Sequence, residues 1–261
     1  MEYNFVIDCS DQRNEYLYKE LCGQYNVQRF GENITYNNNG KYVYIFAPSA
    51  VIDDIAAKKI REGSAVFCLK YSQRIKEILD NKNVTIYRYF DDELLAIKNA
   101  MLTAEGTLAE IIKNTTLSLK EINTLVLGFG RVGKSVVKLL CDNGCKVSVA
   151  TNDEAENALA HLFTENVYKT NDIINYIGNF TVFVNSIPFL MLKGEILNKI
   201  SKDCFIIDLA SKPGGIDYNQ SQLLGLKTLH LLGVPGNFTP QTSGKHIKQS
   251  ILKVLDEDLS K

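Results

Sequence analysis

The fold of this chain is decided by residues 124–133, which read Thr-Leu-Val-Leu-Gly-Phe-Gly-Arg-Val-Gly. Residues 124–127 are typical of a buried strand, and they run directly into a Gly-x-Gly-x-x-Gly turn that an apolar helical run over 136–140 follows. A glycine pattern between a strand and a helix is typical of a dinucleotide-binding site. The pyrophosphate would lie against backbone N–H groups at the start of the helix. The residues expected to bind the dinucleotide are Gly128, Phe129, Gly130, Arg131, Val132 and Gly133.

The end of the next strand, expected over residues 146–150, bears on which dinucleotide is bound. An Asp or Glu about 20 residues after the motif usually binds the 2′-hydroxyl of the adenosine ribose in NAD-dependent proteins. This strand ends instead on Thr151 and Asn152. Without an acid at the strand end nothing repels a 2′-phosphate, so the sequence favours NADP, with NAD as the alternative. The basic residue typical of a 2′-phosphate site is missing too, and Asp153 follows.

Short apolar runs alternate with amphipathic stretches along the whole chain, which predicts βαβ units and mostly parallel sheets. We expect an N-terminal α/β domain over residues 1–102 and a Rossmann NAD(P)-binding domain over 103–240, joined by a linker helix over about 91–114. The last helix, starting at Ser243 within residues 241–261, has no strand after it. Its apolar side needs a surface to cover it, so we expect the helix to pack on the first domain.

Composition excludes several classes of protein. The 261 residues carry 29 Lys plus Arg and 30 Asp plus Glu, which argues against a strongly cationic nucleic-acid binder or a polybasic membrane tether. The longest apolar window, residues 179–192, is too short to span a bilayer, and residues 1–8 lack the basic start of a signal peptide. The six cysteines show neither zinc spacing nor a CxxC pair, so we expect reduced thiols, no metal site and a cytoplasmic protein.

Three loops rich in Pro and Gly follow predicted strands in the second half of the chain. They cover residues 185–188 (Asn-Ser-Ile-Pro), 208–215 (Asp-Leu-Ala-Ser-Lys-Pro-Gly-Gly) and 233–244 (Gly-Val-Pro-Gly-Asn-Phe-Thr-Pro-Gln-Thr-Ser-Gly). Such residues shape any loop, but in a doubly wound sheet the ligand lies across the carboxyl ends of the strands. Three loops at strand ends therefore indicate a site. The loop residues expected to contact the cofactor are Asn185, Ser186, Ile187, Pro188 and Ala210.

Three of these strings, in this order, resemble the A subunits of dipicolinate synthases. They are Gly-x-Gly-Arg-x-Gly from Gly128, Asp-Leu-Ala-Ser-Lys-Pro-Gly-Gly-x-Asp from Asp208, and Gly-x-Pro-Gly-x-x-x-Pro-x-Thr-x-Gly from Gly233. Residues 103–107, Thr-Ala-Glu-Gly-Thr, also look like the interdomain segment of that family. The string from Asp208 is the most diagnostic, because no general nucleotide-binding motif requires it.

The resemblance implies an N-terminal sheet domain of the flavodoxin-like or formate-glycerate-dehydrogenase-like kind, a Rossmann domain, and a C-terminal helix that returns to the first domain. It implies a mother-cell protein of sporulating bacteria that oxidises dihydrodipicolinate to dipicolinate with NADP, beside a flavoprotein-like B subunit. We also expect a homo-oligomer. The family often has Ala-Arg-Ser where this chain has Ala150, Thr151 and Asn152, which bears on the contact with a 2′-phosphate.

A dicarboxylate substrate requires positive potential. Lys212 at a strand end, and the start of the last helix near Thr242 and Ser243, would supply it. Thr103 would add a hydroxyl from the domain junction. Because ring aromatisation drives the proposed oxidation, a strong general base is less necessary than in alcohol oxidation. No catalytic residue is assigned; the candidates are Lys212, Thr103 and His246.

Two other functions remain open, and the positions of the histidines bear on the first of them. His161 is expected on a helix surface, His230 in an apolar strand, and His246 early in the last helix. A different two-domain dehydrogenase, of the 2-hydroxy-acid or amino-acid type, usually places an Arg and a His–acid pair at the substrate loops, and this chain lacks that set. A nucleotide-sensing module without turnover would need the glycine turn but not the three loops.

Overall fold

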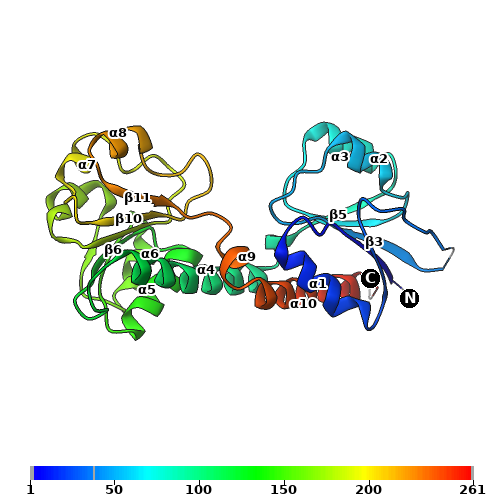
Figure 1. Cartoon of the computed structure of the whole chain (residues 1–261), viewed down its shortest axis with the longest axis horizontal. Coiled ribbons are helices and arrows are strands. Elements are labelled where there is room, and N and C mark those ends of the chain that lie inside the picture. The colour runs from blue at the N-terminus through cyan, green and yellow to red at the C-terminus, as the bar shows by residue number, and fades with distance from the viewer. Residues whose placement is uncertain (1–2, 38, 260–261) are drawn as a thin grey trace. The chain divides into compact units, whose positions relative to one another are not determined.

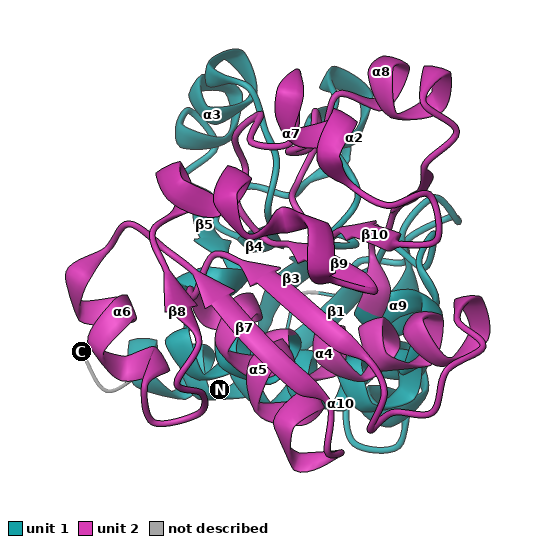
Figure 2. Ribbon diagram, turned by 90° about the vertical axis from the view of Figure 1, so that its left-hand side faces the viewer, with its two compact units in different colours: residues 1–99, 235–261 teal, residues 100–234 magenta. Residues whose placement is uncertain are grey.

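The computed structural model describes residues 3–37 and 39–259, which form two compact units. Unit 1 consists of residues 1–99 and 235–261, and unit 2 of residues 100–234 (Figure 2). Residues 1–2, 38 and 260–261, which belong to the predicted first domain and C-terminal segment, lie outside the described part. The contacts within the chain divide it after residues 99 and 234, whereas the sequence predicts domain boundaries after residues 102 and 240. The predicted boundaries stay a prediction.

Unit 1 is a parallel sheet of five strands in the order β2-β1-β3-β4-β5. Helices α1 and α10 cover one face of this sheet, and α2 and α3 cover the other (Figure 1). Its elements are β1 (Tyr3–Ile7), α1 (Gln12–Cys22), β2 (Asn26–Arg29), β3 (Lys41–Ile45), α2 (Asp54–Lys59), β4 (Ala65–Cys68), α3 (Gln73–Asp80), β5 (Thr85–Arg88), η1 (Tyr89–Asp91) and α10 (Pro240–Leu259).

Helix α10 is part of the core of unit 1. Its residues Ile247, Ile251 and Leu255 are at most 3% exposed and belong to the same buried cluster as residues of β1 and α1. A Cβ added at Gly244 would lie 2.6 Å from the carbonyl oxygen of Arg13, so the two helices cross closely there. The helix begins at Pro240, three residues before the expected start, because the fixed φ of proline suits the first position of a helix.

Unit 2 is a parallel sheet of six strands in the order β11-β10-β9-β6-β7-β8. Helix α4 (Glu93–Asn114) leads into it from unit 1, and α9 (Val234–Phe238) leads out of it. Its other elements are β6 (Asn123–Leu127), α5 (Arg131–Asp142), β7 (Lys146–Ala150), α6 (Glu154–Ala160), β8 (Val167–Tyr168), η2 (Thr170–Asn175), η3 (Ile177–Asn179), β9 (Val182–Asn185), α7 (Glu195–Lys199), β10 (Phe205–Asp208), α8 (Tyr218–Leu223) and β11 (Lys227–His230).

Both faces of the unit 2 sheet are buried. One face packs on α4 and α5, and the other packs on α7 and the short helices η2 and η3. Strands buried on both faces read as continuous apolar runs, as the sequence of β6 does. The predicted fold class, two α/β domains with parallel sheets, is confirmed.

The strand order of unit 2 reverses between β6 and β9. The chain continues from β6 outward to β7 on one side, whereas β9 lies on the other side of β6. Ligands of doubly wound sheets bind at the carboxyl ends of the strands at such a reversal. The register aligns those ends, because Leu127 is paired with both Ala150 and Asn185, and Asn185 with Asp208.

Candidate functional site

The glycine turn after β6 is shaped by two glycines that have no room for a side chain. Gly128 has φ of +88°, a left-handed conformation that side chains with a Cβ rarely adopt. A Cβ on Gly133 would overlap the carbonyl oxygen of Gly128, so helix α5 approaches the end of β6 closely. The first and third glycines of the motif are thus required by the packing of the turn.

The second glycine faces open space. A Cβ added at Gly130 would have one neighbour within 4 Å, Oε1 of Glu156 at 3.9 Å. Gly130 is the N-cap of the 12-residue helix α5 and no side chain caps it, so the first N–H groups of the helix face this space. A backbone open to an approaching group, at a helix N-terminus, fits the pyrophosphate of a dinucleotide.

The loop after β9 lies against the glycine turn. The hydroxyl of Ser186 donates a 2.9 Å hydrogen bond to the carbonyl of Leu127. A Cβ on Gly128 would lie 2.6 Å from Oγ of Ser186 and 2.9 Å from Cγ1 of Ile187. The structure therefore brings these two residues of the predicted cofactor set together with the glycine motif, next to Pro188 in the same loop.

Helix α6, which follows β7, carries an acid near the glycine turn that the sequence motif did not predict. Thr151 is buried, and its hydroxyl donates a 2.8 Å hydrogen bond to Oε2 of Glu156. Asn152 is exposed, and its side-chain oxygen accepts a 2.9 Å hydrogen bond from the backbone N–H of Thr170. The missed signal is the acidic first turn of α6, since Glu156 lies five positions after Thr151, the residue that directly follows β7.

Asp208 at the end of β10 is the buried centre of the second loop. It is fully buried, and its Oδ1 accepts from the backbone N–H of Ala210 at 3.0 Å and from Nδ2 of Asn185 at 2.8 Å. Its Oδ2 accepts from the backbone N–H of Gly215 at 2.7 Å and from the hydroxyl of Tyr218 at 2.5 Å. One carboxylate therefore fixes both ends of the 208–215 loop and ties that loop to the 185–188 loop through Asn185.

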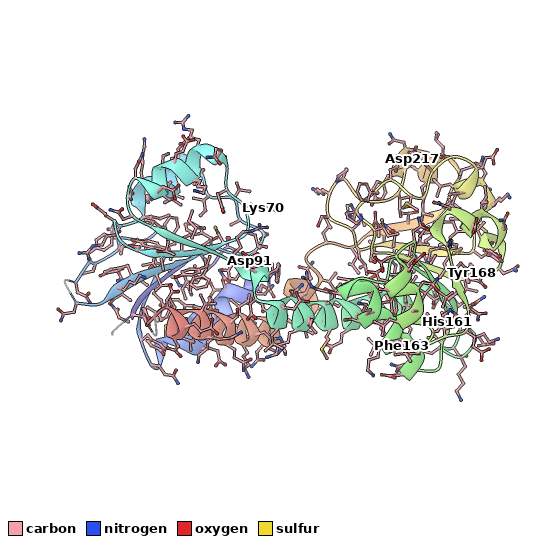
Figure 3. All side chains as sticks on the ribbon, turned by 180° about the vertical axis from the view of Figure 1, so that it is seen from behind. Lys70, Asp91, His161, Phe163, Tyr168 and Asp217 are labelled. Atoms are coloured by element: carbon pink, nitrogen blue, oxygen red, sulfur yellow. The ribbon has the colours of Figure 1, made fainter. Side chains whose placement is uncertain are left out.

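Tyr218 and His230 complete this network. Burial, together with the hydrogen bond to Asp208, raises the pKa of Tyr218 well above its usual value. The ring of His230 stacks on Tyr218 with centroids 5.2 Å apart, and its Nε2 lies 2.8 Å from the carbonyl oxygen of Ala210. His230 is half-buried and hydrogen-bonded at the strand end. Asp217, the last residue of the Asp208 string, caps α8 by accepting from the backbone N–H of Gln220 (Figure 3).

The residues predicted to bind substrate are distributed over both units. In unit 2, Lys212 is exposed in the 208–215 loop, before a cis bond to Pro213, and Thr103 is buried on α4. In unit 1, Thr242 is exposed and Ser243 is buried, both within the first turn of α10. Their roles in substrate binding stay predictions.

The two other histidines lie on helices, His246 in unit 1 and His161 in unit 2. His246 on α10 is half-buried, and its Nδ1 is buried without a hydrogen-bond partner among the described residues. Burial, and to a smaller extent the charge of Lys98, lowers the pKa of His246 below its ordinary 6.5. His161 is exposed at the C-cap of α6, as expected for a surface residue (Figure 3).

Two other features are absent from the described part of the chain. No described helix is both long and apolar enough to cross a membrane. No three described His, Cys, Asp or Glu side chains are grouped so that they would hold a metal ion.

Comparison with known proteins agrees with the motifs. No family model matches the chain. A curated relative, the A subunit of dipicolinate synthase from Bacillus subtilis (strain 168), is 28% identical over 172 residues, which span 66% of this chain and 58% of the relative. The crystal structure of the A subunit of dipicolinate synthase from Bacillus halodurans is 22% identical with a TM-score of 0.84, and the match covers 97% of each chain.

A dehydrogenase with lower sequence identity shares the fold. The NAD-complexed D-isomer specific 2-hydroxyacid dehydrogenase of Lactobacillus delbrueckii ssp. bulgaricus is 10% identical with a TM-score of 0.61, over 99% of this chain and 97% of that one. The shared fold does not distinguish NADP from NAD. The resemblance expected from the motifs is thus confirmed: the chain is similar to the A subunit of dipicolinate synthase and has the fold of NAD(P)-dependent dehydrogenases.

Proposed function

We propose that this protein oxidises dihydrodipicolinate to dipicolinate with a nicotinamide dinucleotide, in the mother cell of sporulating bacteria and beside a flavoprotein-like B subunit. The observation that supports this most is the Asp208 network. Its string, Asp-Leu-Ala-Ser-Lys-Pro-Gly-Gly-x-Asp, is the part of the sequence that a general nucleotide motif does not require. The network holds this string beside the loop that contacts the glycine turn.

The reaction removes a hydride from one ring carbon and a proton from the ring, and the product is an aromatic pyridine. When bound, the nicotinamide ring supplies the acceptor for the hydride. Because aromatisation provides the driving force, the chain needs to position the substrate more than it needs a strong base. We propose that the ammonium group of Lys212 binds a carboxylate of the substrate. Lys212 lies in the 208–215 loop, and Asp208 anchors this loop at both ends.

The form of the dinucleotide is a separate question. The strand end with Thr151 and Asn152 predicts NADP, and that preference stays a prediction.

The proposed reaction is tested with the full chain, alone and with the B subunit, and freshly prepared dihydrodipicolinate. We expect equal amounts of dipicolinate, measured by chromatography, and of reduced nicotinamide, measured by absorbance. A reaction without protein measures spontaneous oxidation, and Gly130→Val is the matched control with a blocked dinucleotide site. Dipicolinate formation no faster than without protein, with NAD and NADP and with the B subunit, would contradict the proposal. Turnover of a 2-hydroxy acid or an amino acid instead would favour the other dehydrogenase types.

A further inference from the structure

The outer edge of strand β5 is open and lies beside a groove that carries more acids than bases. Strand β5 (Thr85–Arg88) is the last strand of the unit 1 sheet, and no described strand pairs with its outer side. We propose, on the basis of the B subunit in the proposed function, that this edge and groove bind an extended segment of that subunit that carries Lys or Arg side chains. The bound segment would add a strand to the sheet of unit 1.

Part of the β5 backbone points away from the sheet. The backbone N–H of Thr85 donates a 3.0 Å hydrogen bond to the carbonyl oxygen of Ser64, the residue before β4. In a parallel pair a strand bonds its neighbour through every second residue, so the N–H groups of Ile86 and Arg88 point outward. Unpaired groups at a strand edge can bind an extended segment through main-chain hydrogen bonds.

The groove lies between β5 and helix α10 and gives the side chains of such a segment an apolar surface. Its volume is about 450 Å³, and its lining includes Phe67, Tyr87 and Val254. The rings of Phe67 and Tyr87 stack with centroids 4.9 Å apart, and the hydroxyl of Tyr87 donates to Asp258 near the end of α10. Because successive side chains of a strand point to opposite faces, a strand added beside β5 would place every second side chain in this groove.

The charges of the groove identify the chemistry of its occupant. Four acids and two bases line it, which leaves a formal charge of −2: Asp91, Asp92, Glu93 and Glu257, with Arg88 and Lys253. Nζ of Lys253 lies 3.6 Å from Oδ1 of Asp92 and 4.0 Å from Oε1 of Glu257, so two acids already share this cation. Asp91 is exposed (Figure 3), and no cation of the described residues is paired with it. An excess of carboxylates favours a partner segment with Lys or Arg and disfavours an acidic one.

The test measures binding of the full chain to the B subunit by isothermal titration calorimetry, at low and at high NaCl. We expect the affinity to fall as the salt concentration rises, because salt screens exposed charges. A double variant, Asp91→Lys with Glu257→Lys, reverses two exposed charges of the groove and should bind the B subunit at least about fivefold more weakly. Glu62→Lys makes the same change at an exposed position of unit 1 outside the groove and should bind as the wild type does.

A second pair of variants tests the strand edge. Arg88→Pro removes the outward N–H, and a proline is tolerated where the N–H of an edge strand faces solvent. Loss of one main-chain hydrogen bond should weaken binding about 2- to 12-fold. Arg88→Ala removes the same side chain and keeps the N–H, so it should bind at least as tightly as the wild type. Equal binding by the two variants would overturn the added strand.

The remaining outcomes separate this inference from the proposed function. All variants should keep the circular dichroism of the wild type and its dinucleotide affinity, because the proposed dinucleotide site lies in unit 2. A double variant that binds the B subunit as tightly as the wild type would overturn the inference and leave the proposed function standing. A dimer of the chain alone that the double variant dissociates would assign the groove to a second copy and overturn the inference too. Absence of any complex with the B subunit would overturn the inference and the partner of the proposed function, whereas dipicolinate formation by the chain alone would still support the reaction.

Discussion

Replacement of Asp208 by alanine should destabilise unit 2 more than most single substitutions. The side chain is fully buried and accepts hydrogen bonds from the N–H groups of Ala210 and Gly215, the amide of Asn185 and the hydroxyl of Tyr218. A hydrogen bond to an ionised group contributes about 1.5–3 kcal/mol, so four independent bonds would amount to about 6–12 kcal/mol. Coupled bonds do not add, and water would enter the space, so we expect a loss of about 3–5 kcal/mol.

Two further variants separate the charge network from the size of the side chain. Asp208→Asn keeps the volume, but in either orientation its NH₂ group faces at least one N–H donor, so we expect a loss of about 1–3 kcal/mol. Asp203→Ala, at an exposed position before β10, should change stability by no more than about 0.5 kcal/mol.

The assay is urea unfolding followed by far-ultraviolet circular dichroism, because the chain has no tryptophan for fluorescence. The two units need not unfold together, so hydrogen exchange of the 208–215 loop provides a local measurement. In Asp208→Ala the amides of Ala210 and Gly215 should lose protection. An alanine variant within about 0.5 kcal/mol of the wild type, with both amides still protected, would refute the assignment of Asp208 as the anchor of the loop.

Three other predictions concern the glycine turn, Lys212 and His246. Gly130→Val should fold but lose dinucleotide binding, because its side chain would fill the open space over the turn. Gly133→Val should fail to fold, because its Cβ would overlap the carbonyl oxygen of Gly128. Circular dichroism measures folding and equilibrium dialysis measures binding, and a Gly130→Val protein that binds the dinucleotide normally would contradict the proposed site. Lys212→Met should raise KM for the dicarboxylate and lower kcat/KM roughly 10-fold, with dinucleotide affinity nearly unchanged, because its charge is exposed and screened; wild-type kinetics would place it outside the site. Because the pKa of His246 is lower in the folded protein, the unfolded chain binds a proton at this residue more readily. The contribution of His246 to stability is therefore fully present above about pH 6.5 and is lost as the pH falls below that value. His246→Gln should make the melting temperature less dependent on pH in this range, and an unchanged dependence would contradict the lowered pKa of His246.

The sequence by itself determined the fold class and the turn after β6. The fold class follows from the alternation of apolar runs and amphipathic stretches along the whole chain. The turn is local, because the apolar run of residues 124–127, the glycine spacing and the helical run after it lie within one short segment. The conformation of Gly128 and the close packing at Gly133 are consequences of that spacing. The loop residues Ser186 and Ile187 lie beside the turn because all strands of a parallel sheet end on the same edge, and their contact with the cofactor stays a prediction.

Only the tertiary structure decided which acids surround the site. Asp208 looked like one residue of a loop string, and its role depends on a register that pairs it with Asn185 and on the position of Tyr218 one helix later. Glu156 lies five residues beyond the position where the motif places an acid, and it reaches the site because α6 begins there and Thr151 holds its carboxylate. A sequence motif gives the spacing of residues along the chain, whereas a hydrogen bond depends on their distance in space. That distance is determined by the conformation of the turn between the strand and the helix, which the motif does not specify.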